Sequence, residues 1–421
     1  MPADTVFWAH TPHTTGPQMT SAVRTRVLIT AICLLAILSL DVWIHGSKAA
    51  ALFSRMHLHA LHALEHPFWD SEPYATGIDS YLAGRSPYTL DDLNNPLPFA
   101  YPPVFVWAGA ALAHLFPATW GWRLYIAVNL GSILVLECAL AWLLLGAVRR
   151  RQWVALACMT PLCSIMSTVF LSGNIHVVWY AAALLAAIPA IRRRQWGWFY
   201  AVAFLAGVNQ PIFLVLLLFP IFAGRRQYFP AAGAVLATGA VYLGERLFVP
   251  EMYSRFQASI ANHLAASHDF GQGVFGIAAV LLARVHVSST RPAVAIQLAF
   301  AAAVYFTLLW LRGRIPVNDR RWWALLALAI VLINPRIMPY DAALGLIPSI
   351  YFFLYALRPR WQAAIVLPVA LASVALHSIV GFTLVLLTAF CVGVWQAAGE
   401  RVFEGPMVGE EETAGKVAVS A

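Results

Sequence analysis

Apolar runs long enough to cross a lipid bilayer recur along almost the whole chain, and this feature constrains the fold most. A transmembrane helix needs about 20 apolar residues, and only helices and closed barrels satisfy their backbone hydrogen bonds in lipid. Of the 421 residues, 61% are hydrophobic and 11% are charged, whereas a soluble domain has about 25% charged residues. The sequence therefore predicts an all-α polytopic membrane protein.

About twelve of the apolar runs are predicted to cross the membrane. They are 27–44, 122–146, 153–171, 175–191, 198–208, 211–223, 229–249, 292–311, 323–339, 341–357, 361–377 and 379–398. Two shorter pieces, 102–118 and 274–284, are predicted to be re-entrant or interfacial. With this solution every arginine cluster and both termini become cytoplasmic, as the positive-inside rule requires.

The same topology divides the chain into one domain and two tails. Residues 24–400 are predicted to form a single transmembrane domain, with a first extracytoplasmic loop at 45–101. The tails 1–23 and 401–421 are predicted to be cytoplasmic, and the second has a composition typical of disorder. The net charge of +8 follows from the cytoplasmic arginines, so nucleic-acid binding is not expected.

The segments with unusual polar chemistry all fall on the extracytoplasmic face. They are the loop 45–101, "SGN" at 172–174, "NQP" at 209–211, the loop 250–273 and "NPRIMPYD" at 334–341. The cytoplasmic loops hold little beyond Arg, Gln and Trp. We therefore expect the functional site on the extracytoplasmic face.

Among the acids of the first loop, Asp70 is the best candidate for a residue with a function. Trp69, Pro73 and Tyr74 surround it in "FWDSEPY", and partial desolvation raises the basicity of a carboxylate. Asp79, Asp91 and Asp92 are interpreted as solvated acids of the same loop.

Other polar residues leave alternatives open. Arg336 could form a salt bridge with Asp341 across a turn, or hold an anionic group through its guanidinium. Asn174 and Gln210 belong to ordinary turns unless they meet in one site, and His268 lies in a glycine-containing loop.

No metal or cofactor is predicted. His59, His62 and His66 have a spacing that could bind a metal, but an amphipathic interfacial helix explains the pattern better. The chain contains no glycine-rich phosphate loop, GxSxG or HExxH. A substrate processed on the outer face must therefore arrive already activated, and a membrane-soluble donor meets that requirement.

The order of motifs resembles glycosyltransferase family 87 of the GT-C superfamily. The resemblance extends over about residues 24–360, through "WDSEPYATGIDSYLAGRSPY", "FAYPP", "SGNIHVVW", "AGVNQPIFLVLLLFPIFAGRRQ" and "NPRIMPYDAALGLIP". It implies a GT-C-type fold and a polyprenyl-phosphate-sugar-dependent mannosyltransferase of the bacterial inner membrane. The donor would be a polyprenyl-phosphate-linked sugar, and the acceptor a glycolipid or glycan.

The resemblance also assigns roles to residues. It implies that Asp70 is the general base of an inverting transfer on the extracytoplasmic face. The expected donor- or acceptor-binding residues are Tyr74, Tyr88, Tyr101, Asn174, Gln210, His268, Arg336, Tyr340 and Asp341. The chain departs from the family by lacking a lysine near Pro211 and a histidine in "IMPYD", so Arg336 is expected to replace the missing cation.

Two other functions stay open at this point. One is a transporter or flippase for lipid-linked glycans, which predicts internal repeats and paired charges inside the membrane. The other is a non-catalytic partner in glycan assembly. A site that brings Asp70 together with Asn174, Gln210 and Arg336 favours the enzyme.

Overall fold

A computed structural model describes residues 68–88, 99–145, 172–267, 271–356 and 381–399. Residues 117, 288 and 318 are excepted from these ranges, and positions 169, 364, 365, 368 and 369 are described in addition. Within these ranges the chain is helical and contains no strand. The tails 1–23 and 401–421, the segments 27–44 and 153–168, most of 361–377, and His268 lie outside the described residues.

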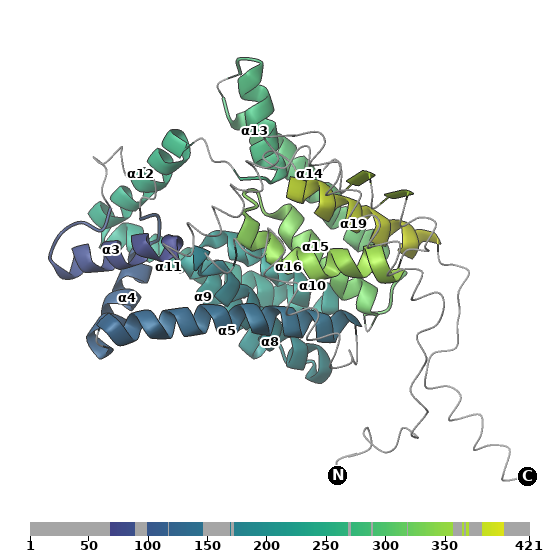
Figure 1. The fold of residues 1–421 in the computed structure, drawn as a ribbon, viewed down its shortest axis with the longest axis horizontal. Helices are drawn as coiled ribbons and strands as arrows, with labels where there is room; N and C mark the ends of the chain where they lie inside the picture. The colour runs from purple at the N-terminus through teal and green to yellow at the C-terminus, as the bar shows by residue number, and fades with distance from the viewer. Residues whose placement is uncertain are drawn as a thin grey trace, which may run out of the picture.

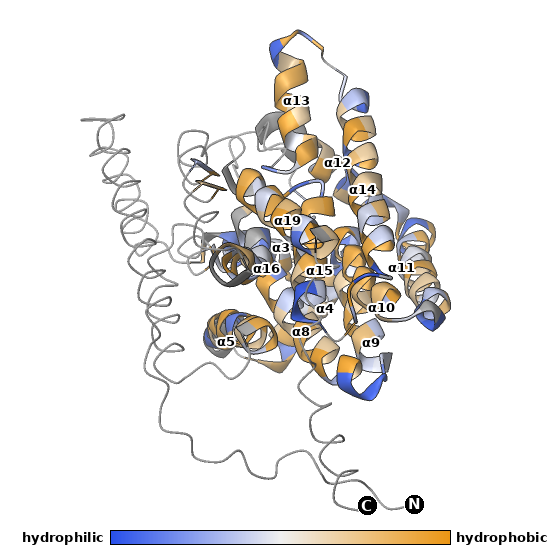
Figure 2. Cartoon of the chain, turned by 90° about the vertical axis from the view of Figure 1, so that its right-hand side faces the viewer, coloured by the Kyte–Doolittle hydropathy of each residue, from blue (hydrophilic) through white to orange (hydrophobic). Residues whose placement is uncertain are grey.

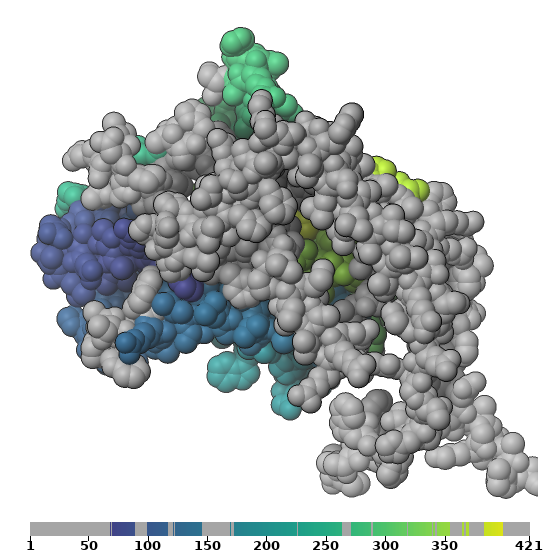
Figure 3. All heavy atoms as spheres, in the orientation of Figure 1, coloured from purple at the N-terminus to yellow at the C-terminus, as the bar shows by residue number. Residues whose placement is uncertain are grey.

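The first half of the described chain builds one end of the molecule and the floor of the helical bundle (Figure 1). Its elements are η1 (Trp69–Ser71), α3 (Glu72–Leu82), α4 (Pro103–Leu115), α5 (Ala118–Leu145), α8 (His176–Arg193), α9 (Gly197–Asn209), η3 (Pro211–Leu217) and α10 (Leu218–Ala223). Figure 3 shows residues 68–88 at that end, beside α5.

The second half completes the bundle. Its elements are η4 (Arg225–Gln227), α11 (Tyr228–Phe248), α12 (Pro250–Ser267), α13 (Val274–Arg284), α14 (Arg291–Leu311), α15 (Arg320–Ile333), α16 (Pro339–Ile350), the π-helix η5 (Tyr351–Ala356) and α19 (Gly381–Gly399). Helix α13 protrudes from the bundle together with the start of α14 (Figure 1).

Helix α15 is the centre of the core. It is apolar on all sides from Trp322 to Leu332 and is buried over that whole stretch, as expected for a helix surrounded by others. Its first turn is capped by Asp319, whose carboxylate accepts a hydrogen bond of 2.9 Å from the backbone N–H of Arg321. Helices α5, α8, α9, α16 and α19 contribute buried side chains to the same core.

The outer faces of the helices are apolar. Trp198, Phe248 and Leu236 expose 83%, 85% and 73% of their surface, and Figure 2 shows hydrophobic residues over the outside of several helices. By length and composition, Arg123–Leu144 and Arg291–Leu311 could each cross a membrane among the described residues. A bent pair, Tyr228–Phe248 with Pro250–Asn262, could supply a third span. The chain is therefore an all-α membrane protein, while the number of about twelve crossings stays a prediction.

The bend between α11 and α12 brings α12 over the first-loop segment. The two helices meet at 115°, at Pro250, which cannot donate a backbone hydrogen bond to continue α11. On α12, Phe256 packs with Tyr88 and Phe99 in a second, smaller aromatic core. This packing joins Tyr88 and Phe99 to the second half of the chain.

Candidate functional site

The turn at 172–174 shapes the centre of the site. Gly173 has a φ of +64°, a left-handed conformation that costs glycine least. A Cβ at this position would also collide with the ring of Phe68. The hydroxyl of Ser172 accepts a hydrogen bond of 3.3 Å from the N–H of Asn174, so the turn is closed by its own side chain.

Two side chains of α5 fix this turn in space. The hydroxyl of Tyr125 donates to the carbonyl of Gly173, and Nδ2 of Asn129 donates to the carbonyl of Asn174 at 3.0 Å. The position of Asn174 is therefore set by α5 as well as by the start of α8.

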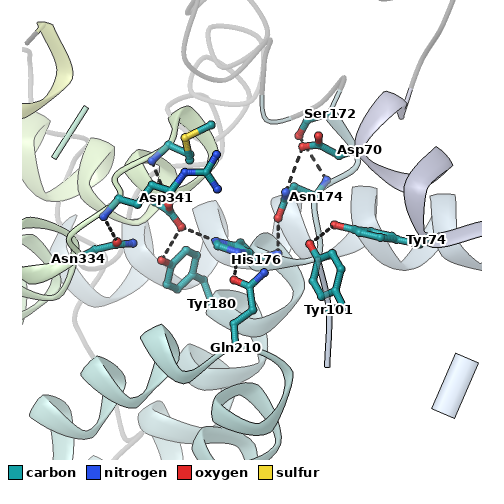
Figure 4. Close-up of polar contacts among 12 residues, drawn as sticks. Asp70, Tyr74, Tyr101, Ser172, Asn174, His176, Tyr180, Gln210, Asn334 and Asp341 are labelled. Carbon is teal, nitrogen blue, oxygen red and sulfur yellow. Dashed lines mark hydrogen bonds and ion pairs between the residues drawn. The ribbon is translucent and has the colours of Figure 1, made fainter. Parts of the chain in front are cut away.

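The orientation of the Asn174 amide follows from its partners (Figure 4). Its Oδ1 accepts a 2.9 Å hydrogen bond from the backbone N–H of His176, and a backbone N–H can only donate. Nδ2 must then point the other way, where it donates to Oδ2 of Asp70 at 3.1 Å. Asn174 thus connects η1 to the first residue of α8.

Asp70 is a partly buried carboxylate with spare acceptor capacity. Among the described residues Asn174 is its hydrogen-bond partner, and Oδ1 accepts nothing from them. Burial raises the pKa of Asp70, while the bond from Asn174 and the positive charges of His176 and Arg336 partly offset that rise. Such a carboxylate is a stronger proton acceptor than a solvated aspartate.

Tyr74 and Tyr101 form a hydrogen-bonded pair beside Asp70. Their hydroxyls are 2.7 Å apart, and their rings meet edge to face with centroids 4.8 Å apart. Burial raises the pKa of both phenols, and the Asp70 charge adds to the rise in each. Both hydroxyls therefore stay neutral near pH 7.

Tyr88 supports this pair from behind. Its side chain is 2% exposed, and its hydroxyl donates to the backbone carbonyl of Tyr101 at 2.7 Å. Its ring packs against Phe99 and Phe256. The contacts of Tyr88 are therefore those of a residue that positions Tyr101.

The "YPP" motif positions Tyr101 from the other side. Pro102 and Pro103 have no backbone N–H, so Val104 has the first one at the start of α4. Oε1 of Glu245, on α11, accepts this N–H at 2.7 Å. A side chain distant in sequence thus caps α4 directly after Tyr101.

Asp341 stabilises the deepest part of the site. It is 0% exposed, and its carboxylate accepts from Nδ1 of His176 at 2.6 Å, the hydroxyl of Tyr180 at 2.8 Å and the N–H of Met338 at 3.0 Å. The Nε2 of His176 lies 2.6 Å from Oε1 of Gln210.

Arg336 lies in a loop that is held on both sides. Oδ1 of Asn334 accepts from the N–H of Arg336 at 2.9 Å, and the N–H of Gln272 donates to the carbonyl of Ile337 at 2.8 Å. Gly271 has a φ of +71°, and a Cβ there would lie 2.8 Å from Cγ of Arg336. The segment that follows residues 268–270 therefore packs directly on Arg336.

Most of the predicted site residues meet in one place. Asp70, Asn174, Gln210 and Asp341 belong to one network of contacts that passes through His176. The Tyr74–Tyr101 pair and Arg336 interact electrostatically with Asp70. Tyr340 packs its ring on His176, with centroids 4.8 Å apart.

The sequence analysis does not select His176 or Tyr180, although they complete this network. The available signal is a histidine inside an apolar run, directly after "SGN", because titratable residues inside spans usually have a purpose. For a metal, the described residues contain no group of three or more His, Cys, Asp or Glu side chains that could hold one. His59, His62 and His66 lie outside the described residues.

The helices with apolar outer faces and the buried polar network define a membrane protein with a polar site at the end of its bundle. The model of glycosyltransferase family 87 matches residues 99–335, which is more than half of the chain. The chain belongs to this family and is a glycosyltransferase. No curated protein and no solved structure matches it.

The range that the family model matches contains only part of the candidate site. Tyr101, Asn174 and Gln210 lie inside it, whereas Asp70, Tyr74 and Tyr88 precede residue 99. Arg336 directly follows the matched range, and Tyr340 and Asp341 also lie beyond it. The family match therefore supports the activity, and the role of Asp70 has to be argued from its surroundings.

Proposed function

We propose that this glycosyltransferase moves a sugar, with mannose as the first candidate, from a polyprenyl-phosphate donor to a hydroxyl of a glycolipid or glycan acceptor. The observation that carries the proposal is Asp70, a partly buried carboxylate with a raised pKa and a free acceptor oxygen within the described residues. The reaction takes place on the extracytoplasmic face of the bacterial inner membrane, where the loop 45–101 is predicted to lie.

In this reaction Asp70 is the general base. Oδ1 of Asp70 takes the proton from the acceptor hydroxyl while the hydroxyl oxygen attacks the anomeric carbon. The bond between that carbon and the phosphate oxygen breaks, and the polyprenyl phosphate leaves with its electron pair. Direct attack inverts the anomeric configuration.

One carboxylate is sufficient for this donor. A phosphate leaves as an anion without needing a proton, whereas a glycosidase needs a second acid to protonate an alcohol leaving group. Arg336 is suited to stabilise the departing phosphate because a guanidinium binds phosphate oxygens through paired hydrogen bonds. Its charge already acts on Asp70 and Tyr101.

The test is a transfer assay with purified protein in lipid nanodiscs, a panel of polyprenyl-phosphate sugars and matching nucleotide sugars. We expect transfer from a polyprenyl-phosphate sugar and none from a nucleotide sugar, with inverted linkage in the product. Efficient transfer from a nucleotide sugar in the absence of any polyprenyl phosphate would refute the proposed donor class.

A further inference from the structure

We propose that the end of the helical bundle opposite the candidate site binds the headgroups of anionic phospholipids, through arginines that aromatic side chains hold in place. The basis is a group of arginines at the helix ends where candidate membrane spans finish. In the topology predicted from the sequence, this end faces the cytoplasm. The proposal does not depend on the proposed donor, acceptor or catalytic base.

Three helices that build the site run from it to this opposite end. Asn129 of α5, His176 of α8 and Gln210, which directly follows α9, belong to the site. The far ends of these helices lie with the start of α11 and the end of α14. The arginines gathered there form what we call the basic end: Arg192, Arg193, Arg194, Arg226, Arg312 and Arg314.

Side chains tie the loops of the basic end to one another. The hydroxyl of Tyr200, at the start of α9, lies 3.2 Å from the carbonyl oxygen of Gln227 and 3.0 Å from its Oε1. Nη1 of Arg312 donates to the hydroxyl of Tyr228 at 3.0 Å. Because Gln227 and Tyr228 are consecutive, the ends of α9, α11 and α14 form one continuous surface.

Two guanidinium groups of the basic end lie on indole rings. Cζ of Arg192 is 4.3 Å from the ring centroid of Trp142, on α5, and Cζ of Arg314 is 3.5 Å from that of Trp310, on α14. Such cation–π contacts engage the flat face of the guanidinium. The N–H groups lie along its edge, in a planar fork that matches the oxygens of a phosphate. These arginines are therefore oriented before a ligand binds.

Little negative charge offsets the basic end. Within the described residues of the loops 194–196, 224–227 and 312–319, the acid is Asp319. Its carboxylate is already paired with Arg321, since Oδ2 lies 2.5 Å from Nη2. The side chains of the basic end are exposed, apart from that of Arg312, which is half-buried. Their positive charge is therefore available to an external anion.

Exposed aromatic side chains place the basic end at the depth of the lipid headgroups. Trp198, at the start of α9, and Phe229, at the start of α11, expose 83% and 88% of their surface. Arg312 directly follows the candidate span Arg291–Leu311. Aromatic residues of this kind gather where a membrane meets water. A soluble polyanion such as a nucleic acid would leave these apolar rings in water, so a lipid headgroup fits the surface better.

The charge of the surface also selects among lipids. The headgroup of phosphatidylcholine carries an ammonium group that opposes binding to arginine, whereas that of phosphatidylglycerol has a net negative charge. A basic residue beside an anionic membrane surface contributes about a factor of five to the binding constant. We therefore expect the basic end to bind phosphatidylglycerol more tightly than phosphatidylcholine.

The test is native mass spectrometry of the full chain in detergent micelles, titrated with phosphatidylglycerol or phosphatidylcholine. The variant Arg312→Gln/Arg314→Gln should bind phosphatidylglycerol about 30-fold more weakly than the wild type, because two basic residues are lost. The matched control is Arg284→Gln/Arg291→Gln, which removes two exposed arginines at the other end of α14 and on α13. The control should keep the affinity of the wild type.

Three results would overturn the proposal. They are equal affinity of the wild type for the two lipids, unchanged affinity in Arg312→Gln/Arg314→Gln, and displacement of the lipid by millimolar inorganic phosphate, which would indicate a site for the free anion. The comparison of lipids uses the wild type alone, so it decides the matter even if the variant does not fold. Thermal unfolding of each variant in detergent shows whether a lost affinity reflects a lost fold.

Discussion

Asp70 and Asp341 are two carboxylates of one polar network, and their surroundings are opposite. Asp341 is fully buried and accepts hydrogen bonds from His176, Tyr180 and Met338. Asp70 is partly exposed and has Asn174 as its hydrogen-bond partner among the described residues. A carboxylate that is saturated with donors is a weak base and cannot reach a substrate, whereas one with a single donor keeps an oxygen for chemistry. The comparison supports the proposal that Asp70 is the catalytic base and that Asp341 has a positioning role.

Of the variants predicted here, Asp70→Asn should have the largest effect on the reaction. We expect kcat to fall by about 10²–10⁴, the range that a general base contributes, while the melting temperature changes little because Asn keeps the shape of Asp. The matched control is Asp79→Asn, because Asp79 is an exposed acid on α3. If Asp70→Asn and Asp79→Asn retain equal activity, Asp70 is not the base.

The main expected effect of Asp341→Ala is a lower stability of the folded protein. It leaves His176, the hydroxyl of Tyr180 and the N–H of Met338 without their acceptor. Leaving a buried hydrogen-bond donor without its acceptor costs about 1–3 kcal/mol, so thermal unfolding in nanodiscs should shift to clearly lower temperature. An unchanged melting temperature with full loss of activity would instead mean that Asp341 takes part in chemistry.

Asn174→Ala should change the pH dependence of the reaction. The hydrogen bond from Asn174 lowers the Asp70 pKa against the effect of burial, so its loss raises that pKa further. Less Asp70 is then ionised at a given pH, and the acidic limb of kcat/KM moves to higher pH. Asn174→Asp places a like charge beside Asp70 and should move the limb further in the same direction. A shift to lower pH in either variant would contradict the role assigned to Asn174.

Tyr88→Phe should have the smallest effect. It removes the hydrogen bond to the buried carbonyl of Tyr101, at a cost of about 1 kcal/mol in the free energy of unfolding, and it leaves the network around Asp70 untouched. Tyr81→Phe, at an exposed position on α3, is the control. A large loss of kcat without a loss of stability would show that Tyr88 contacts the substrate instead of supporting Tyr101.

The positions of several helices follow from sequence alone, and their ends do not. The predicted spans 122–146 and 292–311 correspond to α5 and α14, and the short pieces 102–118 and 274–284 correspond to α4 and α13. Whether α4 and α13 cross the membrane stays a prediction. The span predicted at 323–339 was wrong at its end, because α15 stops at Ile333. Pro335 and Pro339 interrupt the backbone hydrogen bonds there, although the sequence stays apolar enough to suggest a span.

For the helical pair predicted at 198–208 and 211–223, the sequence again predicts the position of the helices better than their local geometry. The break at Gln210 was predicted, but the second piece begins as seven residues of 3-10 helix, η3, before α10. The break turns the side chain of Gln210 toward His176 on α8. Local sequence indicates a break through Pro211, whereas packing decides what the break positions.

The sequence by itself determined the class of protein, since apolar runs of this number have no other stable environment than a membrane. Its polar motifs also singled out Asp70, Asn174, Gln210 and Asp341 before their neighbours were known. Only the tertiary structure decided which acid is enclosed and which is available, because Asp341 meets His176 from a position 165 residues away. Burial and hydrogen-bond partners are properties of the packed helices, and a carboxylate's role depends on both.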